Sequence, residues 1–133
     1  MKFRRLISVD PSLTCSGWAF FSLRGEKLLG IGKIHSRPSS EPLATRLLDL
    51  QQKIAELFER LGLGVGDILI CEGETTMRDP RAAIKVERVR SIFEAVARVR
   101  GVIVPGRINP RSVQSEIMGL RGRQPARVTV KAA

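Results

Sequence analysis

Two short stretches place carboxylates where apolar, strand-like runs end. In SVDPSLTCSGW, Asp10 stands between an apolar run and a turn of small residues, and in DILICEGE, Glu72 and Glu74 follow another apolar run. Carboxylate oxygens are hard ligands that suit Mg²⁺ or Mn²⁺, and these ions keep water and substrate phosphate as their remaining ligands. If the two runs are neighbouring parallel strands, both carboxylates emerge at one sheet edge and can share a cation. Two ions held close together activate water and stabilise the leaving oxygen in phosphodiester hydrolysis.

A simpler interpretation stays open for each carboxylate. Asp10, followed by Pro11 and Ser12, can end a strand and cap a turn, because short polar side chains bond nearby backbone amides. Glu72 can be an ordinary solvated residue at a strand end. Glu74 is the weaker metal-ligand candidate, since its two extra positions put it in the loop beyond the strand.

Other metal or thiol chemistry is poorly supported. Cys15 and Cys71 have no CxxC partner, so we expect reduced, buried thiols. The single histidine, His35, does not combine with them at a familiar zinc spacing. No small organic cofactor is indicated.

The charge of the chain predicts a polyanionic partner. The formal net charge is +10, and residues 78–133 hold thirteen basic and four acidic side chains, so the surplus lies in the second half. Most of these cations are arginines, which match phosphate bidentately and stack on bases. Because the charge does not sit on one isolated amphipathic helix, we favour nucleic acid over a membrane.

Seven basic side chains of this half are candidate phosphate contacts, and a merely solubilising role stays open for each. Trp18, by contrast, is expected to pack in the fold rather than stack on a base. The seven candidates are Arg81, Lys85, Arg88, Arg107, Arg111, Arg121 and Arg123.

The length and composition indicate a single α/β domain. The chain has 133 residues, of which 43% are hydrophobic, enough for one core but not for two domains. No apolar stretch reaches the roughly 18 to 20 residues needed to span a bilayer, and the start of the chain does not look like a signal peptide. We therefore expect a cytoplasmic location.

Three strands are predicted first, over residues 4–10, 17–23 and 27–35, the last two as an antiparallel hairpin. A fourth, central strand is predicted in the DILICEGE stretch, and a short fifth over residues 102–105.

Helices are predicted between these strands. The clearest carries leucine, isoleucine and phenylalanine at three- and four-residue intervals from Leu43 to Leu61, with Ser40 as its N-cap and the glycines of GLGVG as its end. A second spans residues 80–100, with Pro80 in its first turn. A third, short helix is expected over residues 109–118. The order predicts a mixed five-stranded sheet with helices on both faces.

Taken in order, LISVDPSLTCSGWAFFS, DILICEGE, the helix that leads into RGVIVP, and VQSEIMGLRG resemble the RuvC family of Holliday-junction resolvases, within the RNase H-like superfamily. The resemblance implies that Asp10 and Glu72 are catalytic metal ligands. It also implies a crossover junction endodeoxyribonuclease, active in recombination and repair, that binds two Mg²⁺ or Mn²⁺ ions. The partner would be a four-way DNA junction, bound by a homodimer.

The sequence departs from the family pattern at its C-terminal side. The family completes its metal site with two acids, usually aspartates, on a C-terminal helix, and this chain ends at VKAA about where that helix should begin. Glu116 does not match those positions, and Asp79 is typical of a helix start. We therefore expect one RNase H-like domain over residues 1–133 that stops before its last helix and holds metal weakly. A shortened chain, an omitted C-terminal part and a natural non-catalytic derivative remain open, in that order.

Two alternatives to a nuclease remain. One is a catalytically silent nucleic-acid-binding module of the same fold, which would bind DNA with strong salt dependence but not cut it. The other is a fragment of the actin and sugar-kinase fold, in which a similar turn binds nucleotide phosphate. That fold needs a second domain, for which this chain is too short.

Overall fold

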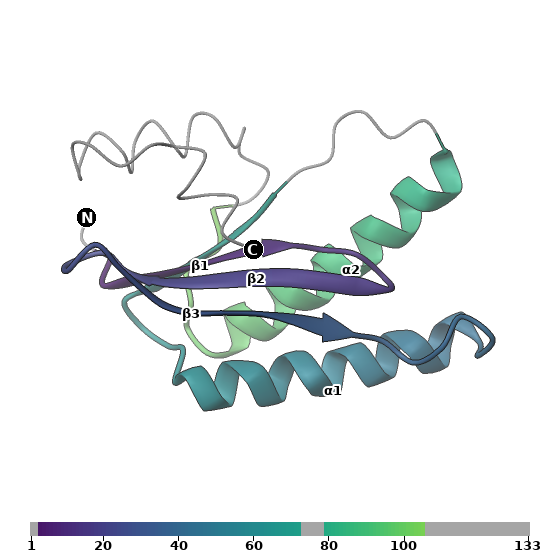
Figure 1. Ribbon diagram of the computed structural model, residues 1–133, viewed down its shortest axis with the longest axis horizontal. Coiled ribbons are helices and arrows are strands. Elements are labelled where there is room, and N and C mark those ends of the chain that lie inside the picture. The colour runs from purple at the N-terminus through teal and green to yellow at the C-terminus, as the bar shows by residue number, and fades with distance from the viewer. Residues whose placement is uncertain (1–2, 73–78, 106–133) are drawn as a thin grey trace.

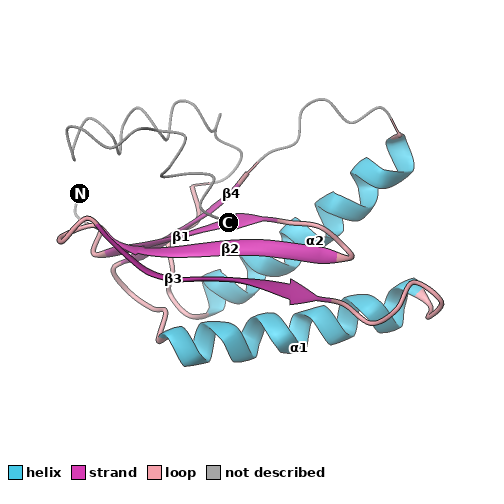
Figure 2. Ribbon diagram, in the orientation of Figure 1, coloured by secondary structure: helices cyan, strands magenta, loops and turns pink. Residues whose placement is uncertain are grey.

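The computed structural model describes residues 3–72 and 79–105, which form one mixed sheet covered by two helices (Figures 1 and 2). The strands are β1 (Arg5–Asp10), β2 (Cys15–Ser22), β3 (Lys27–His35) and β4 (Asp67–Cys71), and their order in the sheet is β3-β2-β1-β4. β1 pairs with β2 and β2 with β3 in antiparallel fashion, whereas β1 and β4 are parallel. The predicted hairpin, and the mixed sheet with β1 beside β4, are thus confirmed.

The predicted fifth strand is reduced to a single bridge. Ile103 pairs in parallel with Ile68, the amide of Leu69 donates to the carbonyl of Ile103 at 2.9 Å, and the amide of Ile103 donates to the carbonyl of Asp67 at 3.0 Å. Within residues 3–72 and 79–105 the sheet therefore has four strands and one bridge, rather than five strands. Among these residues, the ladder on this side of β4 stops at Leu69.

The first helix, α1 (Leu43–Leu61), follows the predicted apolar stripe but not the predicted start. Its N-cap is Pro42, with no capping side chain, so the prediction of Ser40 is wrong. The fixed φ of proline suits the entry to a helix, and α1 begins directly after it. At the other end Gly62 takes the left-handed conformation, φ 66°, and closes the helix as predicted.

The second helix, α2 (Pro80–Val99), begins as expected. The Asp79 side chain accepts a hydrogen bond from the amide of Arg81 at 3.0 Å, and Pro80 occupies the first turn, where its missing N–H costs nothing.

Both described helices cover the same face of the sheet (Figure 1). Their buried side chains, such as Leu50, Ile54, Phe58 and Phe93, join one core cluster with sheet residues such as Ile7. The opposite face carries a smaller apolar cluster of Leu6, Ala19, Phe21 and Ile68. Helices on both faces were predicted; in the described part of the chain they lie on one, and the predicted helix over 109–118 lies outside it.

Trp18 and the cysteines test three packing expectations. The Trp18 ring packs over the glycines of β3, and a Cβ added at Gly32 would lie 2.7 Å from it, so the packing role is confirmed. Both cysteines are free, but only Cys71 is buried; Cys15 is half-exposed on β2.

Among the described helices, neither is long and apolar enough to span a bilayer.

Candidate functional site

Asp10 and Glu72 lie side by side at one end of the sheet. The parallel register pairs Val9 of β1 with Cys71 of β4, and the amide of Glu72 donates to the carbonyl of Val9 at 2.8 Å. The next residues of the two chains, Asp10 and Glu72, are therefore neighbours across the ladder, at the spacing of about 5 Å that separates adjacent strands.

The side chains of these two residues leave the same face of the sheet. Successive strand residues point to opposite faces. Val9 and Cys71 belong to the core beneath the helices, so the residues that follow them take the other face. Asp10 is exposed and Glu72 is half-buried, so solvent reaches both. We call this pair at the ends of β1 and β4 the carboxylate edge.

The donor set of the carboxylate edge fits a hard divalent cation. Mg²⁺ is commonly held by one or two carboxylates, with water and substrate phosphate completing its octahedron. Two carboxylates on adjacent parallel strands, on one face and open to solvent, supply such a set. No group of three or more potential ligand residues occurs among the described residues. Glu74 lies outside them.

Arg90 of α2 reaches the carboxylate edge from below the sheet. Its Nη2 donates to the carbonyl of Glu72 at 2.9 Å, and its Nε lies 3.8 Å from the Glu87 carboxylate. Although charged, Arg90 is only 6% exposed. This functional candidate was missed at the sequence level. The available signal was an arginine four residues after Val86 and three before Phe93, on the apolar side of a predicted helix.

The thiol beside this site is inert. Burial, and to a smaller extent the carboxylate of Glu94, raises the pKa of Cys71 to about 12. The thiol is therefore neutral at physiological pH and is a poor ligand or nucleophile.

The predicted basic side chains of α2 lie in the helix layer. Arg81, Lys85 and Arg88 are all exposed, as a phosphate-binding role requires. They do not share the face of the carboxylates, because α2 packs on the opposite face of the sheet through Val89 and Phe93. They therefore approach the carboxylate edge from the opposite face of the sheet, and their phosphate-binding role stays a prediction.

The first turns of α2 nevertheless extend past the carboxylate edge. At about 1.5 Å per residue, Arg81 lies roughly 13 Å further along the helix axis than Arg90, whose side chain meets Glu72. Figure 1 shows this end of α2 projecting beyond the strands. The cations of α2 thus flank the edge instead of covering it.

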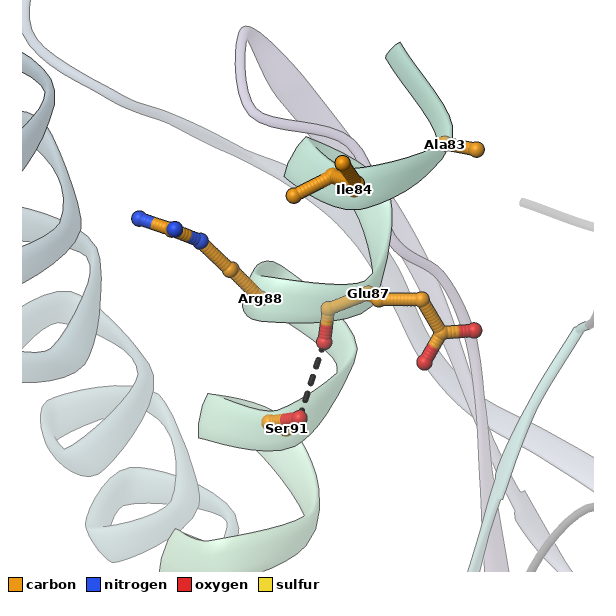
Figure 3. A pocket seen from close by; sticks show the side chains of 5 residues that line it. All are labelled: Ala83, Ile84, Glu87, Arg88 and Ser91. Carbon is orange, nitrogen blue, oxygen red and sulfur yellow. Dashed lines mark hydrogen bonds between the residues drawn. The ribbon is translucent and has the colours of Figure 1, made fainter. Parts of the chain in front are cut away.

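A shallow hollow marks the outer side of these turns. It measures about 340 Å³ and is lined by Ala83, Ile84, Glu87, Arg88 and Ser91. Figure 3 shows Arg88 and Glu87 leaving α2 in different directions, with the Ser91 hydroxyl donating to the Glu87 carbonyl at 2.9 Å. The hollow is too open to enclose a small ligand.

The other predicted phosphate contacts lie outside the described residues. They are Arg107, Arg111, Arg121 and Arg123.

Comparisons with known proteins agree with the sequence resemblance. No protein-family model matches the chain. The crossover junction endodeoxyribonuclease RuvC of Chelativorans sp. (strain BNC1) is 29% identical over 118 residues, covering 87% of this chain and 66% of the relative. RuvC of Cereibacter sphaeroides (strain ATCC 17029 / ATH 2.4.9) is 26% identical over 116 residues, covering 87% and 67%. The chain thus spans about two thirds of the length of these curated relatives.

Solved structures establish the fold. Thermus thermophilus RuvC in complex with a Holliday junction substrate superposes with a TM-score of 0.68 at 19% identity, covering 92% of this chain and 81% of that one. A second Thermus thermophilus RuvC structure gives a TM-score of 0.68 at 18% identity, covering 95% and 79%. The predicted α/β, RNase H-like fold and the resemblance to RuvC are confirmed.

Proposed function

We propose that this chain, which resembles the RuvC resolvases along most of its length, is the nuclease part of a metal-dependent endodeoxyribonuclease that cuts four-way DNA junctions. One observation carries the proposal: Asp10 and Glu72 are neighbours on one face of the sheet, at the carboxyl ends of two parallel strands and within reach of solvent. A catalytic site in an open sheet commonly forms at this end of its strands.

In this proposal the two carboxylates hold Mg²⁺ or Mn²⁺, with two ions in the complete site. A bound divalent cation supplies an activated water and stabilises the charge that develops on the leaving oxygen. Asp10 and Glu72 fix the cation against the scissile phosphate. Glu74 is a further candidate ligand. The exposed position of the edge lets a phosphate backbone approach without a deep pocket.

The cations of α2 would orient the DNA. Arg81, Lys85 and Arg88 are exposed and flank the carboxylate edge, where they can contact the backbone of a junction arm. The names of the curated relatives, and the junction in the Thermus complex, support a branched DNA substrate. Arg107, Arg111, Arg121 and Arg123 are proposed as further phosphate contacts.

The test is cleavage of a labelled four-way junction by the full chain with Mg²⁺ or Mn²⁺. Asp10→Asn and Glu72→Gln each keep the side-chain shape and remove one charge, so each should lower the cleavage rate on the order of 100-fold or more, the scale of losing one charge-stabilising group. Glu56→Gln, at an exposed position of α1, is the matched control and should cut like the parent chain. Parent-level cleavage by Asp10→Asn would refute the assigned site.

A silent binding module is the second candidate. It is favoured by the presence of only two clustered carboxylates in the described part of the chain. Tight junction binding by the parent chain, with no cleavage at any Mg²⁺ or Mn²⁺ concentration, would support it and refute the nuclease.

We further propose that the active species is a homodimer, since a four-way junction presents two equivalent strands to cut. Light scattering of the eluting protein should then give twice the chain mass. A monomer that still cuts both strands at equal rates would refute the dimer. The cytoplasmic location stays a prediction.

A further inference from the structure

Both backbone polar groups of Glu72 are hydrogen-bonded. Its N–H donates to the carbonyl of Val9 on β1 at 2.8 Å, and its carbonyl accepts from the Arg90 guanidinium at 2.9 Å. The first bond belongs to the sheet. The second comes from the middle of α2, a different layer of the fold.

The guanidinium bonds a carbonyl that lies one residue past the end of β4. The N–H of the same residue bonds β1, whereas the amide of Leu69, on the other side of β4, donates to Ile103. The Glu72 carbonyl lies in a partly buried contact and needs a donor, because leaving a buried carbonyl unpaired costs as much as losing a hydrogen bond. Arg90 supplies that donor to the one residue whose carboxylate belongs to the proposed metal site.

The charge of Arg90 is offset locally. The Glu87 carboxylate lies 3.8 Å from its Nε, one helical turn away on α2. Figure 3 shows Glu87 leaving the helix on a different side from the exposed Arg88. Arg90 therefore places a hydrogen-bond donor at Glu72. The Glu87 carboxylate offsets its positive charge, which reduces the repulsion of a metal ion bound nearby.

We propose that Arg90 is a positioning residue of the carboxylate edge: by bonding the Glu72 carbonyl it fixes the peptide plane, and thereby the direction in which the Glu72 carboxylate leaves the strand. The inference rests on the proposed function, since it assumes that Glu72 binds metal. Residues that orient metal ligands commonly change metal affinity 10- to 100-fold when replaced.

The test is Mn²⁺ affinity, measured from the free-ion electron paramagnetic resonance signal without DNA. Arg90→Met has similar length but no donor, so it should weaken Mn²⁺ binding on the order of tenfold. Arg90→Lys keeps a donor and the charge but loses the planar guanidinium group. Its Mn²⁺ affinity should lie between those of Arg90→Met and the parent chain. Junction binding in EDTA should stay within about twofold, since exposed cations carry it.

Two controls separate positioning from stability. Val89→Ala removes buried volume next to Arg90 without touching the Glu72 carbonyl, and should lower the melting temperature but not the Mn²⁺ affinity. Arg98→Met removes an exposed arginine of the same helix and should change neither.

The outcomes distinguish two failures. A parent chain that binds Mn²⁺ no better than Asp10→Asn overturns the metal site, and with it the role of Arg90. A parent chain that binds Mn²⁺, with folded Arg90→Met binding equally well, overturns only the role of Arg90. If Arg90→Met does not fold, Arg90→Lys decides: an affinity equal to that of the parent refutes the inference.

Discussion

Arg5 and Asp67 form a bidentate ion pair at the end of the sheet opposite the carboxylate edge. The two bonds measure 2.9 and 2.8 Å, and Arg5 also donates to the carbonyl of Gly62 at 2.8 Å. Asp67 is fully buried and accepts from the amide of Gly64 at 2.9 Å. The pair joins β1, β4 and the end of α1. Asp67 is a structural acid at the start of β4, whereas the proposed metal ligand Glu72 follows the end of the same strand.

Removing Arg5 should be costly. Arg5→Met leaves the buried Asp67 carboxylate without its cation, so we expect a loss of roughly 3 to 5 kcal/mol in the free energy of unfolding, measured by urea denaturation. Arg37→Ala, which breaks the exposed pair with Glu41, should cost less than about 1 kcal/mol. Equal losses in the two variants would contradict the structural role of the buried pair.

The Cys71 thiol should make stability fall at high pH. Burial raises its pKa in the folded chain to about 12, against 9.0 for a free thiol. Below pH 9 both states keep the proton and the thiol has no effect. Between pH 9 and 12 only the unfolded chain loses it, so unfolding becomes easier by about 1.4 kcal/mol per pH unit.

Cys71→Ala isolates this effect. The variant loses packing at every pH, but its free energy of unfolding should fall less steeply than that of the parent chain from pH 9 to 10.5. Parallel slopes would show that the thiol ionises equally in both states.

At the scale of elements, a large side chain on β2 of the β2–β3 hairpin is matched by a glycine on β3. Trp18 faces Gly32 across the ladder, and only a glycine leaves room for the ring. Gly32→Ala would bring a Cβ to 2.7 Å from the ring, whereas at Gly30 the shortest approach is 3.3 Å.

We therefore expect Gly32→Ala to destabilise the chain by about 1 to 3 kcal/mol, the usual cost of overpacking, and Gly30→Ala by less. Trp18 is the single tryptophan, so its fluorescence reports the site directly. The emission of folded Gly32→Ala should shift to the red as the ring moves toward solvent. An unchanged spectrum and stability would mean that the ring does not cover β3 in solution.

At the scale of the whole molecule, the cations of α2 flank one end of the sheet. The β2–β3 turn and the last turn of α1 lie at the other end, where Arg5 pairs with Ser22 and bonds the carbonyl of Gly62. The two ends offer matched sets of exposed basic residues for comparison.

Junction binding should depend on the α2 end. Changing Arg81, Lys85 and Arg88 to alanine should reduce the slope of log affinity against log salt by up to about three, roughly one for each lost phosphate contact. The control triple Arg24→Ala, Lys27→Ala and Arg60→Ala removes the same charge at the other end and should leave the slope nearly unchanged. If the two triple variants had the same slope of log affinity against log salt, junction binding would depend on net charge and not on the residues of α2.

The sequence by itself determined the main helices and strands and some of their ends. The spacing from Leu43 to Leu61 predicted α1, the hairpin followed from the break between two strand-like runs, and Asp10 and Glu72 stood out because a carboxylate ends each of two apolar runs. These are local signals, set by the periods of helix and strand and by residues that stop them.

The tertiary structure decided which of these residues meet. Only the pairing of β1 with β4 makes Asp10 and Glu72 neighbours on one face. Only the packing of α2 shows that its basic side chains lie on the other side of the sheet. Only the tertiary structure shows that Arg90 is buried and donates a hydrogen bond to the Glu72 carbonyl. Such contacts join residues far apart in the chain, and they depend on how the layers bury apolar surface together, which no local pattern of residues encodes.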